Sequence, residues 1–178
     1  MRRAAILVLA VACATLGACS RSLDATDPTD QEPTTVSLKI QNDGPSTAYV
    51  YRACVLDFTI TSLANPSVPI NRVEGCAVCE CSQTSCPICG ACYEAPEEIA
   101  AGGQLTESWL TVNVTTENRK IGSCQRLHAL PAGSYRIELP VYRTQADAAA
   151  KVLPRVMTQV FTLPAPDDTV TIPIGVSQ

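Results

Sequence analysis

The sequence is poor in the residues that most catalytic sites require. It holds one histidine, His128, among 178 residues. No serine lies in the Gly-x-Ser-x-Gly context of a hydrolase nucleophile elbow. A serine or cysteine nucleophile needs a base beside it, and we expect His128 to be a loop residue before the Leu130-Pro131 turn. The chain therefore specifies no reaction, and we expect a protein that is not an enzyme and that carries no cofactor.

A membrane-spanning apolar run and a basic cluster are also lacking. The apolar stretch 4–14 is too short to cross a bilayer as a helix, which takes about 20 residues. A chain without Arg2 and Arg3 keeps eleven basic residues against seventeen acidic ones. Nucleic acids and anionic lipid surfaces are bound largely through Lys and Arg. We therefore expect no nucleic acid among the partners.

The N-terminal residues have the pattern of an export signal. Arg2 and Arg3 precede the apolar stretch 4–14, and small residues follow it. We therefore expect residues 1–18 to be a signal peptide and not an anchor helix. The next segment, 19–35, is rich in Asp, Pro and Thr and has one large apolar residue. Because it cannot bury enough surface to fold, we expect a disordered tether.

The end of the signal carries a family resemblance. Leu16-Gly17-Ala18-Cys19 resembles the lipobox of bacterial lipoproteins, in which a cysteine becomes the lipidated N-terminus. The resemblance implies lipidation of Cys19, and several acyl chains together make such anchoring stable. Ser20 stands where an inner-membrane retention signal places Asp, so the resemblance implies the outer membrane. Ordinary cleavage after Ala18, which would release a soluble protein, is the alternative.

Residues 36–178 read as one β-domain. Apolar and polar residues alternate in short runs separated by Pro, Gly and Asp turns, which predicts strands with one buried face. Pro173 removes a backbone donor, so the last strand should lie at a sheet edge. We expect a single antiparallel, immunoglobulin-like β-sandwich with a cysteine-rich loop insertion at 75–93. The expected strands are 36–40, 48–54, 56–62, 105–116, 135–141, 156–163 and 170–176, with a break at 65–69, a loop around 95–103 and a helical turn at 145–153.

A partial resemblance points to the same architecture. Four short motifs occur in an order similar to the bacterial intracellular proteinase-inhibitor domain (BsuPI type). They are Asn42-Asp43-Gly44, Leu56-Asp57-Phe58-Thr59-Ile60, Glu107-Ser108-Trp109 and Leu130-Pro131-Ala132-Gly133-Ser134-Tyr135. The likeness touches most of residues 36–143 and implies the sandwich fold. The export signal and the insertion at 75–93 depart from that family, so the likeness implies the fold rather than protease inhibition.

Cysteine is the abundant reactive residue, and six of the ten cysteines lie within 76–92. An even set in an oxidising envelope compartment predicts disulfides, up to four here, with the pairing left open. Cys54 and Cys124 lie near expected strands and could join the loop to the sandwich. The predicted disulfide cysteines are Cys54, Cys76, Cys79, Cys81, Cys86, Cys89, Cys92 and Cys124.

Metal binding is the main alternative for this cluster. Cysteines one or two residues apart allow two thiolates to reach one soft ion such as Zn(II) or Cu(I). Against it, thiols persist poorly outside the cytosol, and the Cys79 to Cys86 spacing is shorter than zinc ribbons use. Cys86-Pro87-Ile88-Cys89 resembles a glutaredoxin-like redox pair, but no helix follows to lower a thiol pKa. The candidate metal ligands are Cys76, Cys79, Cys81, Cys86, Cys89 and Cys92.

Other polar and aromatic residues have plainer interpretations. Glu97 and Glu98 are expected to be solvated in a loop, and Trp109 to be a core aromatic residue. The sequence thus predicts an outer-membrane lipoprotein with a non-enzymatic binding or structural role. It would contact the membrane through its N-terminal lipid and present a disulfide-stapled loop to an envelope protein partner. A metal-handling lipoprotein that binds Cu(I) or Zn(II) is the alternative.

Overall fold

The computed structural model describes residues 32–75, 78–88, 90–119 and 122–175. Cys19, the predicted signal peptide and most of the predicted tether lie outside these ranges. Cys76 and Cys89 also lie outside them. Within the described ranges, no helix combines the length and the hydropathy that a bilayer crossing demands.

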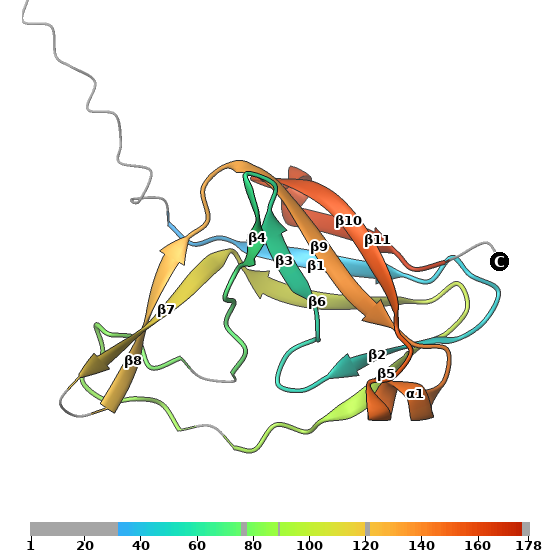
Figure 1. Cartoon of the computed structure of the whole chain (residues 1–178), viewed down its shortest axis with the longest axis horizontal. Coiled ribbons are helices and arrows are strands. Elements are labelled where there is room, and N and C mark those ends of the chain that lie inside the picture. Colours follow the sequence, from blue (N-terminus) through green and yellow to red (C-terminus); the bar gives the residue numbers. More distant parts are fainter. Residues whose placement is uncertain (1–31, 76–77, 89, 120–121, 176–178) are drawn as a thin grey trace, which may run out of the picture.

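The described chain is built almost entirely of β-strands, as Figure 1 shows. The strands are β1 (Thr35–Gln41), β2 (Ala48–Arg52), β3 (Thr59–Ser62), β4 (Asn65–Pro69), β5 (Ala95–Ile99), β6 (Gln104–Leu110), β7 (Val112–Arg119), β8 (Gly122–Ala129), β9 (Gly133–Val141), β10 (Arg155–Leu163) and β11 (Thr169–Pro173). One α-helix, α1 (Gln145–Ala150), and one 3-10 helix, η2 (Pro166–Asp168), complete the described elements.

The strands form packed sheets, so the predicted all-β sandwich is confirmed. One sheet has the order β11-β1-β6, and the other has the order β10-β9-β3-β4. The pairs β2-β5 and β7-β8 stand beside them. All strand pairs are antiparallel except β1 with β11, which run parallel. Pro173 lies on β11, an edge strand, and pairs with Gln41 of β1. An edge position suits proline, because proline has no backbone N–H to donate.

The core lies between the sheets and follows the alternation in the sequence. Val36, Leu38 and Ile40 of β1 are fully buried, and the neighbours between them are not. Each such side chain contributes about 1.5–3 kcal/mol by leaving water. Trp109 is buried and packs its ring edge-on against Phe161, with the ring centroids 6.0 Å apart. The interpretation of Trp109 as a core aromatic residue is therefore confirmed.

Four expectations about local structure were wrong. Residues 65–69 are strand β4 and not a break, and 95–99 are strand β5 and not a loop. The long strand expected over 105–116 is two strands, separated at Thr111. The Thr111 backbone N–H donates to the Thr34 carbonyl (2.8 Å), which turns the chain from β6 into β7. His128 lies in β8 opposite Asn113 and not in a loop.

The one predicted helical segment is present. Thr144 caps α1, because its hydroxyl oxygen accepts a hydrogen bond from the Asp147 backbone N–H (3.1 Å). The helix ends at Lys151, which takes the left-handed conformation with φ 52°. Lys151 then reaches back to the sandwich, with its ammonium 3.9 Å from the centre of the Tyr51 ring.

Candidate functional site

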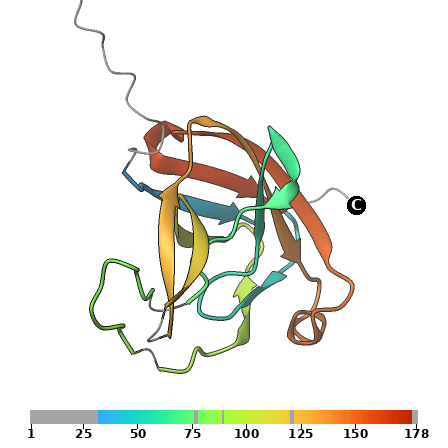
Figure 2. The ribbon, with the colours of Figure 1, turned by 60° about the vertical axis from the view of Figure 1, so that its left-hand side comes forward.

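The hairpin of β7 and β8 is the platform for the cysteine loop, defined here as residues 75–93. The two strands pair over eight residues, from Val112 opposite Ala129 to Arg119 opposite Gly122. In Figure 1 the hairpin extends to one side of the sheets, and the chain from β4 to β5 runs along it. Figure 2 shows the same chain as a long excursion beside the hairpin. The hairpin thus carries the loop away from the core.

A disulfide and a short stretch of backbone pairing attach the loop to β8. Cys81 is bonded to Cys124, with a Cα–Cα distance of 5.0 Å, and Cys124 is buried. The Cys81 N–H donates to the Gln125 carbonyl (2.9 Å), and the Gln125 N–H donates to the Cys79 carbonyl (2.7 Å). These two bonds make a parallel bridge between Glu80 and Gln125. The loop therefore adds a minimal third strand to the hairpin at this point.

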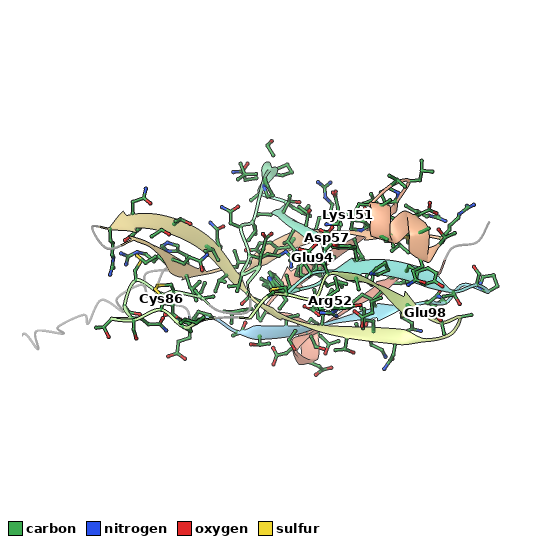
Figure 3. All side chains as sticks on the ribbon, turned by 90° about the horizontal axis from the view of Figure 1, so that it is seen from below. Arg52, Asp57, Cys86, Glu94, Glu98 and Lys151 are labelled. Atoms are coloured by element: carbon green, nitrogen blue, oxygen red, sulfur yellow. A yellow bond between two sulfur atoms is a disulfide. The ribbon has the colours of Figure 1, made fainter. Side chains whose placement is uncertain are left out.

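Two further disulfides hold the loop elsewhere. Cys54, just after β2, is bonded to Cys92 with a Cα–Cα distance of 4.9 Å. Cys79 is bonded to Cys86 with a Cα–Cα distance of 4.7 Å, which closes a small ring within the loop. Figure 3 places Cys86 beside the hairpin, far from Arg52 at the base. All three Cα–Cα distances suit disulfides.

The expectation that this chain carries disulfide bonds is therefore confirmed. The pairing, which the sequence left open, joins Cys54 with Cys92, Cys79 with Cys86 and Cys81 with Cys124. Two of these bonds link the loop to the domain and one is internal to the loop. The predictions for Cys76 and Cys89 fall on residues outside the described ranges.

An ion-pair network fixes the segment that carries Cys54. The Arg52 guanidinium bonds Glu97 of β5 (2.5 Å) and Glu107 of β6 (2.6 Å). The Glu107 side chain is only 9% exposed, and its second oxygen accepts from the Leu56 backbone N–H (3.3 Å). Burial lowers the pKa of Arg52, but the hydrogen bonds to both glutamates outweigh it, and the pKa is raised. Residues 52–56 are thus clamped on both sides of Cys54.

The glutamates of β5 differ from expectation. Glu97 was expected to be solvated, but it belongs to this ion-pair network, while Glu98 on the other face of β5 is exposed. Figure 3 shows Glu94, Asp57 and Lys151 gathered near Arg52. The Tyr51 hydroxyl donates to Glu94 (2.7 Å), just after the end of the loop. That hydrogen bond is the main reason why the pKa of Tyr51 is raised. The C-terminal end of the loop is therefore fixed by Cys92 and by Glu94.

A second charged pair crosses the hairpin beneath the disulfide. The Arg126 guanidinium donates to both oxygens of Glu117, at 2.7 and 3.0 Å. These hydrogen bonds lower the pKa of Glu117. At pH values above the ordinary pKa of Glu, the pair therefore stabilises the hairpin. This contribution is lost as the pH falls through the lowered pKa of Glu117. The Glu117 carboxylate also lies within 4.8 Å of the sulfurs of Cys81 and Cys124.

The loop exposes two large apolar side chains, one near its middle and one at its C-terminal end. Ile88 is 99% exposed and Tyr93 is 86% exposed. The loop holds one glutamate, Glu80, and no Lys, Arg or His, and Glu74 and Glu94 flank it. Ile88 and Tyr93 were not contact candidates from the sequence alone. The available signal was that they are large apolar residues inside an otherwise small and polar cysteine-rich stretch.

The chemistry available at this site is limited by the sulfur bonding. A cysteine in a disulfide has no thiolate to offer a metal or a substrate. The six described cysteines are therefore structural while they stay oxidised. The site is a loop held by disulfides, with Ile88 and Tyr93 exposed at its surface. Comparison with protein-family models, curated proteins and solved structures gives no match for this chain.

Proposed function

We propose that this protein is an envelope lipoprotein with a non-enzymatic binding role, which presents the cysteine loop to a protein partner. The observation that carries the proposal is the contrast between fixed backbone and exposed side chains in this loop. Disulfides at Cys81 and Cys92 fix it to the domain, yet Ile88 and Tyr93 stand almost wholly in solvent. Exposed apolar residues on a fixed support are typical of interaction sites.

The fixed loop favours binding energetically. Association costs the ordering of loops and side chains, and a loop that is already held loses less entropy. Tyrosine is enriched among the residues that dominate interface energies. Glu80 in the loop and Glu74 and Glu94 beside it would steer a partner with a basic surface and would raise its association rate. The partner expected is therefore a protein with an apolar pocket rimmed by Lys or Arg.

A photo-crosslinking side chain tests the loop as a contact site. Placed at Tyr93 and irradiated in the cell envelope, it is expected to give a discrete adduct with a partner. Leu153 is the matched control, because it is also 86% exposed but follows α1 and is remote from the loop in sequence. Mass analysis of the adducts gives the readout. Equal adduct patterns at the two positions, or no adduct at Tyr93, would reject the loop as the contact site.

The yield of the adduct should also depend on the exposed side chain of Ile88. We expect Ile88→Asp to lower the yield at position 93 by about tenfold, because it removes apolar contact and adds charge at a fully exposed side chain. Ser85→Asp, which adds the same charge at an exposed polar position of the loop, is the control and should lower the yield less.

The membrane anchor rests on the lipobox likeness at Cys19. We expect Cys19→Ala to leave the precursor unprocessed, because lipoprotein processing needs the modified cysteine. The mobility and the metabolic lipid labelling of the envelope protein provide the measurement. A normally processed, unlabelled and soluble product from the unchanged chain would instead support ordinary cleavage after Ala18.

Metal handling remains the second proposal, and one observation favours it. The sulfurs of Cys81 and Cys124 and the Glu117 carboxylate all lie within 4.8 Å of one another. If this disulfide were reduced, two thiolates and one carboxylate could hold Zn(II). The proposal therefore requires a reduced state of the loop. The BsuPI-type likeness stays a prediction about the fold and carries no inhibitor function here.

A further inference from the structure

Strand β10 is a long edge without a neighbouring strand on its outer side. It is the first strand in the order β10-β9-β3-β4. Its register with β9 is continuous over nine residues, from Arg155 opposite Val141 to Leu163 opposite Gly133. Strand β11, which follows β10 through η2, belongs to the other sheet. Within the described residues, no strand pairs with the outer edge of β10.

The backbone groups of alternate β10 residues point to this open side. The Ser134 carbonyl of β9 accepts from Leu63 (2.9 Å), on the side of β3, so the odd-numbered residues of β9 face β10. Ile137 pairs with Gln159, so the odd-numbered residues of β10 face β9. The even-numbered residues must then face outward. The Val160 carbonyl fits this assignment, because it accepts a hydrogen bond from its neighbour's side chain, Gln159 Nε2 (2.8 Å).

The exposed residues of β10 lack the usual protection of an edge. Natural edge strands are blocked by lysine, proline or a bulge. The register of β10 with β9 has no shift, and the outward residues are uncharged and β-branched. Val156 and Val160 are each about half exposed. The outward residues of β10 are Val156, Thr158, Val160 and Thr162.

We propose that β10 is the docking edge for a second copy of this chain, and that the two copies pair antiparallel about Gln159. In this register Val156 lies opposite Thr162 of the other copy, and Thr158 lies opposite its Val160. Each outward residue can then both donate and accept a backbone hydrogen bond. A two-fold axis repeats the same contact from both sides, as is usual in homodimers.

Charge at the two ends of the strand favours antiparallel over parallel pairing, because parallel pairing would place Arg155 beside Arg155 of the other copy. Arg155 begins β10, and the exposed Asp167 and Asp168 follow its end. None of these three side chains forms an ion pair within the described residues. Pairing about Gln159 places Arg155 opposite Leu163 of the other copy, four residues before that copy's Asp167. The acidic end of each copy is thus on the side of the other copy's arginine, and no like charges lie opposite each other along the strand.

A charge-swap series on the full, processed chain in detergent solution tests the proposal. The masses of the species are measured by sedimentation over increasing concentration. We expect a concentration-dependent dimer for the unchanged chain. T158K/V160K places lysine opposite lysine twice and should raise the dissociation constant about tenfold or more. T158K/V160E places lysine opposite glutamate of the other copy and should restore the dimer, because the register makes positions 158 and 160 partners. Within each copy the new lysine also lies opposite Glu138 of β9 and the new glutamate opposite Arg136.

The controls separate this contact from the cysteine loop and from misfolding. Positions 158 and 160 are exposed and lie opposite Glu138 and Arg136 of β9. T158K/V160E adds two favourable cross-strand pairs and T158K/V160K adds one favourable and one unfavourable pair, so both variants should remain folded at the temperature at which the unchanged chain is folded. Tyr93→Ala should leave the dimer intact. A monomer at all concentrations would overturn the proposal, as would a dimer that survives T158K/V160K. Failure of T158K/V160E to restore dimerisation in a folded protein would overturn the register.

Discussion

Replacement of Cys81 and Cys124 together by alanine is expected to lower the free energy of unfolding by about 4 kcal/mol. The bond joins residues 43 apart in sequence, the longest separation among the three described disulfides. A cross-link restricts the unfolded chain more when it closes a longer loop, so this bond should stabilise the domain most. Urea unfolding of the double variant against the unchanged chain gives the difference, provided that the slope of the transition is the same.

The internal bond of the loop is the control. Cys79 and Cys86 are only 7 residues apart, so C79A/C86A should cost about 2.5 kcal/mol in the same entropic estimate. It should also leave the backbone pairing of Cys81 with Gln125 in place. An equal or larger loss for the short bond would show that chain entropy is not what these disulfides contribute.

Replacement of Arg52 by methionine is expected to cost about 3 kcal/mol of unfolding free energy. Arg52 is 29% exposed, but its partner Glu107 is only 9% exposed and would keep a buried carboxylate without its cation. Removing one partner of a buried pair costs more than the pair itself contributes, because the other charge stays desolvated. The measurement is again urea unfolding. The change should also weaken the hold on residues 52–56, and hence on Cys54.

The second partner of Arg52 supplies a matched control. Glu97 bonds the same guanidinium, but its side chain is 33% exposed. Glu97→Gln should therefore cost within about 1 kcal/mol, as is usual for pairs that water can reach. If Glu97→Gln destabilised the domain as much as Arg52→Met, burial of Glu107 would not be the source of the effect.

The strands that bury one face were predictable from the sequence, and the others were not. In β1 and β9 apolar residues alternate with polar ones, and every second side chain is buried. The missed strands β4, β5 and β8 lack that signal. Strand β4 is exposed throughout and contains two prolines, and β8 is mostly polar. Their structure depends on partners, β3 for β4 and β7 for β8, that no local pattern specifies.

At the candidate site, the presence of disulfides was predictable from the sequence, but the contacts that position them were not. An even number of cysteines in a chain with a predicted export signal indicates disulfides, and this prediction needs no structure. The partner of Cys124 could not be predicted, because Cys124 lies on β8, whose hairpin the sequence analysis did not find. Arg52 and Glu107 are 55 residues apart and meet only through the folding of β2, β5 and β6. The motif that contains Glu107 does not indicate Arg52 as its partner.

The central claim is that the cysteines serve as structural cross-links that hold the loop for recognition. Peptide mapping of the envelope-purified protein, digested without reduction after alkylation of free thiols, tests it most directly. The account predicts three linked peptide pairs, Cys54 with Cys92, Cys79 with Cys86 and Cys81 with Cys124, and no alkylation at these six positions. Alkylated cysteines at these positions, together with bound Zn(II) or Cu(I) that a chelator removes, would contradict it and favour metal handling.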